Sequence, residues 1–133
     1  MPDAVIDTSA MIEMLILPGR DRELRRRVTL ADLAAPEIFD LEVANVLRIL
    51  VHLGRLADRE AGQLLRQLVR SPVERAPHKP LMRRIWELRG SVRPYDAAYV
   101  ALAELLDVPL ITCDAKLAGS NGHNVKFELY IPS

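Results

Sequence analysis

The sequence contains a single cysteine, Cys113, among 133 residues, so no disulfide can form within the chain. No apolar run approaches the roughly 20 residues that span a bilayer. The first residues also lack the basic region, apolar core and cleavage site of a signal peptide. These absences argue against a disulfide-stapled secreted domain and against a membrane protein, and we expect a cytoplasmic protein.

An excess of charge of either sign is also missing, because 18 basic and 18 acidic residues give a formal net charge of +0. Bulk charge therefore neither predicts nor excludes a nucleic-acid partner. Lysine is scarce, since only three of the basic residues are lysine and the other 15 are arginine. Arginine is the better bidentate ligand for phosphate, although arginine runs such as 20–27 and 83–93 more often form a solvated helix face.

Two common kinds of site have no sequence support. No glycine-rich phosphate loop follows any predicted strand, which argues against a nucleotide-binding switch. The three histidines, His52, His78 and His123, show no metal-ligand spacing, so a zinc site is not expected. We interpret Cys113 as a small buried residue, and Trp86 and Tyr99 as core or interface residues.

The chain alternates short apolar segments with helical patterns. Strands are predicted at 4–6, 33–35, 73–76, 110–112 and 125–129. Helices are predicted at 10–17, 21–30, 36–54, 58–70 and 77–89, and another begins at Pro94. The pattern predicts an α/β protein, a three-layer sandwich with a short, mostly parallel five-stranded sheet flanked by helices, in which residues 1–133 form one domain.

Two acids stand at the ends of predicted strands. Asp7 directly follows the strand at 4–6, and Asp114 comes just after the strand at 110–112. If these strands are parallel neighbours, their acids meet at the same edge of the sheet, where open α/β sheets place their ligands. Thr8 or Ser9 is expected to cap the helix that follows Asp7.

A third acid, Glu42, lies inside the longest predicted helix. It falls on a stripe of the helical wheel that also carries Ile38, Val46, Ile49 and Leu53. Burial of an unpaired carboxylate costs several kcal/mol, so Glu42 needs a cation, a shared proton or a wet cavity if this stripe is buried. Asn45, one turn further on, is expected to orient it. The alternative is a solvated acid, or one that is paired with arginine.

Asp96 lies in the first turn of the helix that begins at Pro94. An acid at this position favours the helix dipole and needs no other role, although Val100 and Ala103 flank it on the wheel. Taken together, two acids at strand ends and two beside packed helix faces suit an oxygen-ligand site for Mg²⁺ or Mn²⁺. The charge of such an ion offsets the repulsion among the carboxylates.

Four motifs follow one another along the chain: VIDTSA at 5–10, EVANVL at 42–47, RPYDAAYVALA at 93–103 and LITCDAKL at 110–117. In this order and at this length, they resemble PIN-domain ribonucleases, and in particular the VapC toxins of VapBC toxin–antitoxin systems. The likeness covers essentially the whole chain. It implies endonucleolytic cleavage of RNA that depends on Mg²⁺ or Mn²⁺.

The resemblance also implies roles for individual residues. The family's catalytic acids correspond to Asp7, Glu42, Asp96 and Asp114, of which Asp7, Asp96 and Asp114 would hold the ion and Glu42 would accept a proton from the attacking water. Its hydroxyls near the metal correspond to Thr8 or Ser9 and to Thr112. Some relatives carry a further acid shortly after the last one, but here Ala115, Lys116 and Leu117 follow. This departure argues against a second occupied metal site, and we expect Lys116 and Arg93 to meet RNA phosphates.

The expected partners are an RNA substrate, a VapB-like antitoxin and a second copy of the chain. The long helix has apolar residues almost all round, which favours a helical interface, and these are Phe39, Leu41, Val43, Val46, Leu47 and Leu50. Two alternatives stay open at this point. One is an RNA-processing nuclease without an antitoxin, and the other is a non-catalytic module that binds RNA or protein on the same fold.

Overall fold

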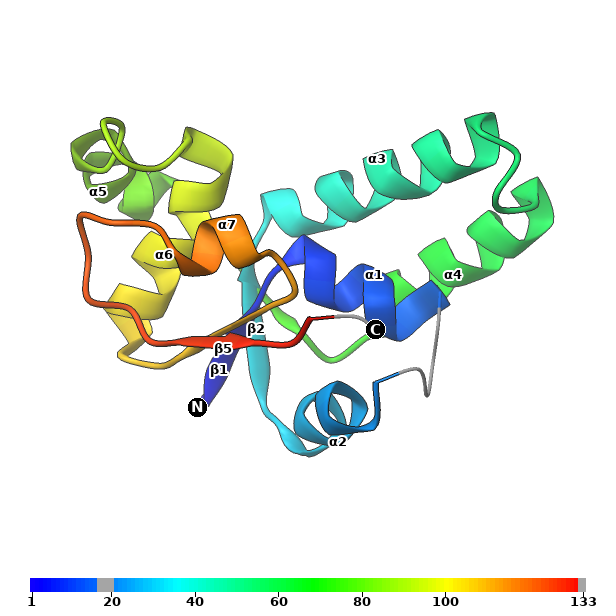
Figure 1. Ribbon diagram of the computed structural model, residues 1–133, viewed down its shortest axis with the longest axis horizontal. Coiled ribbons are helices and arrows are strands. Elements are labelled where there is room, and N and C mark those ends of the chain that lie inside the picture. The colour runs from blue at the N-terminus through cyan, green and yellow to red at the C-terminus, as the bar shows by residue number, and fades with distance from the viewer. Residues whose placement is uncertain (17–20, 132–133) are drawn as a thin grey trace.

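The computed structural model describes residues 1–16 and 21–131 (Figure 1). Its strands are β1 (Ala4–Ile6), β2 (Leu33–Pro36), β3 (Glu74–Ala76), β4 (Leu110–Thr112) and β5 (Phe127–Leu129). Its helices are α1 (Thr8–Ile16), α2 (Arg22–Leu30), α3 (Ile38–His52), α4 (Asp58–Arg70), α5 (Met82–Glu87), α6 (Pro94–Leu106) and α7 (Ala115–Ala118), with a short 3-10 helix, η1, at Lys79–Leu81.

The five strands form one parallel sheet in the order β3-β2-β1-β4-β5. The central strand β1 therefore pairs with β2 on one side and with β4 on the other. Parallel neighbours need crossover connections, and the helices between the strands supply them. This arrangement confirms the predicted three-layer α/β sandwich.

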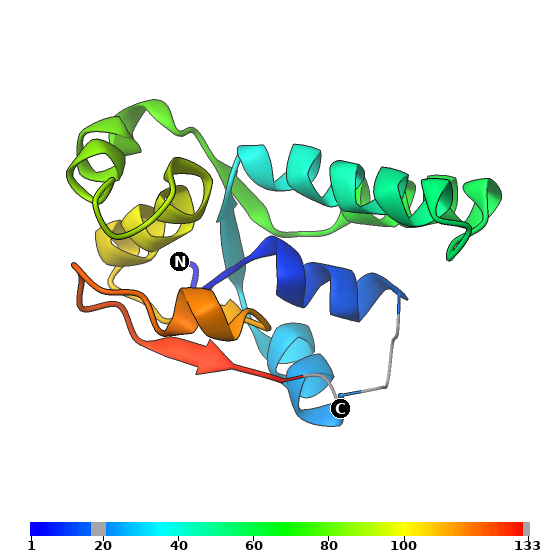
Figure 2. The same ribbon diagram turned by 45° about the horizontal axis from the view of Figure 1, so that its top comes forward.

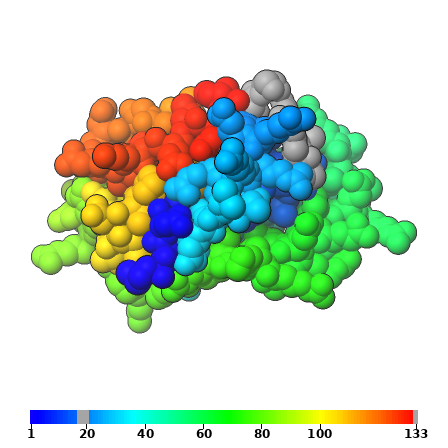
Figure 3. Space-filling view, turned by 90° about the horizontal axis from the view of Figure 1, so that it is seen from below, coloured from blue at the N-terminus to red at the C-terminus, as the bar shows by residue number. Residues whose placement is uncertain are grey.

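Helices lie on both sides of the sheet. Figures 1 and 2 show α5 and α6 on one side of the strands and α1, α3 and α4 on the other. α6 packs against β1, β2 and β4, while α5 packs against α6. Figure 3 looks at the end of the molecule that carries the N-terminus, and α2 (light blue) lies near the middle of that face. The carboxyl ends of β1 and β4 point to the opposite end.

Small side chains let α6 approach the sheet closely. All seven residues from Ala97 to Ala103 are buried, and four of them are alanine. All residues of β1, β2 and β4 are buried as well. Because both faces of these strands are covered, their sequences are continuous apolar runs rather than alternating ones. This rigid centre holds the ends of β1 and β4 in place.

The long helix α3 buries a different face from the one predicted. Its buried residues are Phe39, Val43 and Leu47, whereas Ile49 and Leu53 of the predicted stripe are exposed. α3 packs mainly against α1 and α4, so these two helices determine which side of it is covered. α3 and α4 are joined by a turn in which Gly54 has φ +73°, as expected for a glycine that ends a helix.

Other boundaries also differ from the predictions. The helix predicted at 77–89 is replaced by η1 and the six-residue α5, because Pro80 interrupts the start of the segment. Helix α1 begins at Thr8, earlier than predicted, and its predicted end at Leu17 lies outside the described residues. No helix in 1–16 or 21–131 is long and apolar enough to cross a membrane.

Candidate active site

The register between β1 and β4 brings the predicted acids to one edge of the sheet. Ile6 pairs with Ile111, so the following residues, Asp7 and Thr112, lie side by side. The Asp7 backbone N–H donates to the Ile111 carbonyl oxygen over 3.1 Å and continues the pairing as far as α1. Because the two strands run in the same direction, Asp114 follows at the same edge.

Asp7 is a buried carboxylate held by three donors. Its Oδ1 accepts from the Ser9 hydroxyl at 2.7 Å and from the Ala10 backbone N–H at 3.0 Å. Its Oδ2 accepts from the Thr112 hydroxyl at 2.5 Å. Since a carboxylate has about four lone-pair sites, Oδ2 keeps one site that is open to another partner. Burial raises the pKa of Asp7 to about 6, although the hydrogen bonds from Thr112, Ala10 and Ser9 oppose this shift.

The loop after β4 is tied to the same network. The Thr112 hydroxyl accepts from the Asp114 backbone N–H at 2.9 Å, and the Ser9 hydroxyl accepts from the Cys113 backbone N–H at 2.9 Å. Asp114 is the N-cap of α7, where its Oδ1 accepts from the backbone N–H groups of Lys116 and Leu117. These bonds fix Asp114 relative to Asp7.

Asp96, in the first turn of α6, is half-buried. Within the described ranges its carboxylate takes part in no hydrogen bond or ion pair. Burial is the main cause that raises its pKa, followed by the negative charge of Asp114, whereas Arg93 and Lys116 lower it. The negative charge of Asp114 also raises the pKa of Asp7. Asp114 therefore stands within electrostatic reach of both other aspartates.

Glu42 is held by residues other than the predicted one. Its Oε1 accepts from the Tyr99 hydroxyl at 2.6 Å and from the Thr8 hydroxyl at 3.1 Å. The predicted partner, Asn45, is instead exposed, and its side-chain oxygen accepts from Arg48. Asn45 thus lies outside the site, because the face of α3 that carries it is turned to solvent.

Tyr99 is the residue of the site that sequence reasoning missed. Its ring is 2% exposed, in keeping with its expected place in the core, but its hydroxyl reaches Glu42 and lies 2.9 Å from the Thr8 hydroxyl. Tyr99 comes three residues after Asp96 on α6, one turn along the same helix face. That spacing was the only signal in the sequence that could have placed it here.

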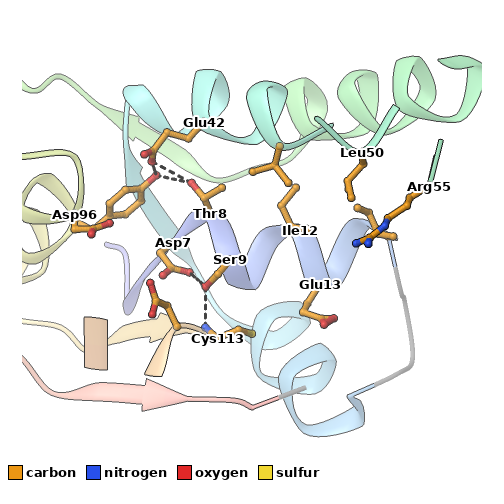
Figure 4. A pocket seen from close by; sticks show the side chains of 14 residues that line it. Asp7, Thr8, Ser9, Ile12, Glu13, Glu42, Leu50, Arg55, Asp96 and Cys113 are labelled. Atoms are coloured by element: carbon orange, nitrogen blue, oxygen red, sulfur yellow. Dashed lines mark hydrogen bonds between the residues drawn. The ribbon is translucent and has the colours of Figure 1, made fainter. Parts of the chain in front are cut away.

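All four predicted acids line one pocket of about 720 Å³. Figure 4 shows Glu42 and Thr8 along one side of it, with Asp7, Ser9 and Cys113 on the other. Asp96 lies at the end of the pocket near Glu42 and Asp7, Asp114 also lines the pocket, and the pocket extends past Ile12 and Leu50 to Arg55. Segments that are far apart in the sequence therefore converge on one cavity with four carboxylates.

The carboxylates of the pocket suit a hard cation that keeps part of its water shell, rather than one that is enclosed entirely by protein ligands. Among residues 1–16 and 21–131, no three histidine, cysteine or acidic side chains form a ready-made metal cage. Mg²⁺ commonly keeps several waters and takes only one or two carboxylates directly. The open lone pair of Asp7 and the unbonded carboxylate of Asp96 offer such oxygen ligands, and a positive ion would relieve the repulsion between the aspartates.

Comparison with known proteins identifies the family. A model of the PIN domain matches residues 4–119. The chain is 40% identical over 125 residues to Ribonuclease VapC12 of Mycobacterium tuberculosis, which covers 94% of this chain and 97% of that relative. The chain belongs to the PIN-domain family, among the VapC ribonucleases. The matched range of this PIN domain includes Asp7, Glu42, Asp96 and Asp114.

Solved structures share the fold of this PIN domain. The PAE2754 protein of Pyrobaculum aerophilum superposes with a TM-score of 0.65 and 25% identity, over 86% of this chain and 76% of that one. A toxin–antitoxin complex from Klebsiella pneumoniae contains a chain with a TM-score of 0.61 and 20% identity, over 87% of this chain and 90% of its own. The arrangement of sheet and helices is thus that of known PIN domains.

Proposed function

We propose that this VapC-family chain is an endoribonuclease that hydrolyses RNA phosphodiester bonds with the help of Mg²⁺ or Mn²⁺, and that it acts as the toxin of a toxin–antitoxin pair. The observation that carries the proposal is the convergence of Asp7, Glu42, Asp96 and Asp114 on one pocket. Such a cluster repels an RNA backbone unless a cation is bound, so it favours metal-dependent chemistry over simple RNA binding. The relatives named ribonucleases support the same reaction class.

Three aspartates would hold the cation, directly or through water. Asp7 offers the free lone pair of its Oδ2, and Asp96 and Asp114 line the same pocket, where the charge of Asp114 acts on both other aspartates. Ser9, Ala10 and Thr112 fix the Asp7 carboxylate by hydrogen bonds, so no side-chain rearrangement is needed to present it. When bound, the cation supplies Lewis acidity, which makes water a better nucleophile and offsets charge on the phosphate.

Glu42 is the candidate proton acceptor. Its Oε1 is occupied by Tyr99 and Thr8, which leaves Oε2 to accept a proton from the attacking water. Attack in line with the leaving 3′ oxygen then breaks the bond between phosphorus and that oxygen. The water oxygen stays on the phosphate, and the 3′ oxygen takes up a proton from solvent water. Lys116 and Arg93, both exposed beside the aspartates, would attract the RNA backbone towards this centre.

Cleavage of structured RNA by the purified chain tests the proposal. We expect cuts with Mg²⁺ or Mn²⁺, none in EDTA, and a loss of at least about 100-fold with Asp7→Asn or Asp96→Asn. Asp58→Asn is the matched control, because Asp58 is exposed on α4 and lies outside the acidic pocket. The proposal fails if the wild type cuts no RNA with either ion, or if the two pocket variants cut as fast as the control.

We also propose that an antitoxin and a second copy of this chain cover apolar surface on the α3–α4 pair. Leu41 and Val69 are each 68% exposed, and Leu53 is 57% exposed. Large exposed apolar side chains on adjacent helices are typical of interaction surfaces.

Co-expression with the product of a short reading frame overlapping this one upstream should give a complex that no longer cuts RNA. Light scattering of the chain alone should give the mass of a dimer, and a monomeric mass would refute the dimer.

A further inference from the structure

We infer that a second hollow beside the acidic pocket binds the RNA phosphate adjacent to the one that is cleaved. This inference rests on the proposed RNA cleavage and assigns a second binding position along the strand. The hollow has a volume of about 250 Å³, and its polar lining comes from Ser91, Arg93, Asp96, Asp114, Lys116 and Ser120. It lies between the turn that precedes α6 and the helix α7.

The two cavities share a wall. Asp96 and Asp114 line both the acidic pocket and the second hollow, whereas Asp7 and Glu42 line only the acidic pocket. A strand whose scissile phosphate lies over the aspartates has an adjacent phosphate one nucleotide away. The second hollow is the neighbouring cavity that continues from the same two aspartates, so it is placed to receive that phosphate.

The cations in the second hollow are available to a ligand. Several arginines elsewhere in the described chain are already engaged: Arg27 pairs with Glu128, Arg75 with Asp40 and Arg84 with Glu104. In contrast, Arg93 and Lys116 have no carboxylate within ion-pair distance among residues 1–16 and 21–131. Both side chains are exposed, and the positive charge of each lowers the pKa of Asp96. They are therefore near the aspartates without being neutralised by them.

The remaining lining groups also suit a phosphate. Ser91 and Ser120 carry hydroxyls that can donate to phosphate oxygens. Ser120 is held by His123 at 2.8 Å, which limits its rotation. A small free anion would be attracted by Arg93 and Lys116 and repelled by Asp96 and Asp114. A backbone phosphate differs because the rest of the strand, engaged in the acidic pocket, brings it into place.

Methylphosphonate scanning tests the inference. The cut site of the wild type is first mapped on a short single-stranded RNA with Mg²⁺ or Mn²⁺. Each phosphate near that site is then replaced in turn by an uncharged methylphosphonate, and the cleavage rate is measured. We expect replacement of one adjacent phosphate to slow the wild type at least about tenfold, as expected for a lost charged contact. The same replacement should slow the double variant Arg93→Ala/Lys116→Ala by less than twofold, because this variant already lacks the two side chains that contact the phosphate.

Two further variants separate the subsite from general electrostatics. Arg59→Ala/Lys79→Ala removes the same charges at exposed positions outside both cavities, and it should respond to the scan like the wild type. Lys116→Arg keeps the charge and should retain most of the response. RNA binding in EDTA is weaker, because no cation offsets the carboxylates, but it is free of cleavage. There the slope of log K for RNA binding against log[salt] should become smaller by about 0.7 for each cation removed from the hollow.

The outcomes distinguish the two proposals. If the wild type cuts the RNA but the scan affects Arg93→Ala/Lys116→Ala as strongly as the wild type, the second phosphate position is refuted and the ribonuclease stands. If the wild type cuts no RNA at all, the proposed function fails and the subsite fails with it. The melting temperature of Arg93→Ala/Lys116→Ala should equal that of the wild type. This control ensures that a lost effect of the methylphosphonate does not reflect unfolding of the variant.

Discussion

The Tyr99 hydroxyl donates a 2.6 Å hydrogen bond to Oε1 of Glu42, and this bond connects helix α6 to helix α3 across the acidic pocket. Thr8 completes the arrangement with a 3.1 Å bond to the same oxygen. Burial raises the pKa of Tyr99 far above its usual value, and the neighbouring Glu42 carboxylate raises it further. The phenol therefore stays protonated and acts as a permanent donor that sets the direction of Glu42.

Removal of this donor should slow RNA cleavage. Tyr99→Phe keeps the buried ring and loses only the hydroxyl, so Glu42 is left with the weaker support of Thr8. We expect the single-turnover cleavage rate to fall about tenfold, equivalent to about 1.4 kcal/mol. Stability should change by no more than about 1 kcal/mol, because the ring still fills the core. Cleavage rates and urea unfolding of both proteins provide the measurements.

A double-mutant cycle shows whether Tyr99 acts through Glu42. In a Glu42→Gln background, Tyr99→Phe should cause little further loss of rate, since the group that it positions has already been changed. Full additivity of the two effects would contradict the positioning role. Tyr95→Phe is a suitable control because Tyr95 is 63% exposed and does not line the acidic pocket.

The acids of the pocket could be predicted from the sequence, but Tyr99, the hydrogen-bond partner of Glu42, could not. Asp7, Asp96 and Asp114 were predictable because strand ends and helix starts are local features, and parallel pairing brings strand ends together. Glu42 was predicted from its place within an apolar helix. The partners of Glu42 were not, because they depend on which face of α3 packs against α1 and α4. Apolar residues surround α3, so the helical wheel alone does not determine its buried face, and Asn45 was predicted in place of Tyr99.

The raised pKa of Asp7 predicts an unusual dependence of stability on pH. In EDTA, the folded chain should hold the Asp7 proton up to pH about 6, while the unfolded chain releases it near the usual aspartate pKa of 3.8. The folded state therefore loses relative stability as pH rises from about 4 to 6, by about 3 kcal/mol from this residue. Asp7→Asn should remove this contribution, so its stability relative to the wild type should increase over that range.

Urea unfolding of both proteins at pH 4, 5, 6 and 7 measures the effect, because the other titrating groups cancel in the difference. Mg²⁺ at pH 7 should stabilise the wild type and leave Asp7→Asn almost unchanged, since the ion favours the charged carboxylate. A difference between the two proteins that stays constant with pH would contradict the assignment.

The strands were easier to predict than some of the helices. β1 and β4 are short apolar runs that end in polar residues, and both strands match their predicted bounds. The segment 77–89 has helical spacing throughout, yet only Met82–Glu87 forms an α-helix. Here Pro80 and packing against α6 decide the outcome, and tertiary packing of this kind is absent from a local pattern.

Thr112 should be essential to the network around Asp7. Its fully buried hydroxyl donates to Oδ2 of Asp7 and accepts from the Asp114 backbone N–H, so Thr112→Val removes the one protein donor to Oδ2 among the described residues and the acceptor of that N–H. We expect the free energy of unfolding to fall by about 2 kcal/mol. Metal-dependent cleavage should also weaken, because the lost bond favours the charged form of Asp7. Thr112→Ser keeps the hydroxyl and should retain most of the cleavage rate, and equal losses in both variants would rule out the hydroxyl as the cause.

The C-terminus of α6 offers a test of backbone strain away from the acidic pocket. Asp107 caps this helix with φ 55° and ψ 51°, and it is the only non-glycine residue with positive φ in the described part of the chain. Aspartate tolerates this left-handed conformation, whereas a β-branched side chain does not. Asp107→Val should therefore lower the free energy of unfolding by about 1–2 kcal/mol, while Asp107→Asn should have little effect.

Leu105→Val is the control at an exposed helical position nearby, and it should lower the free energy of unfolding by less than about 0.5 kcal/mol. Equal costs for Asp107→Val and Leu105→Val in urea unfolding would show that the left-handed backbone stores no such strain.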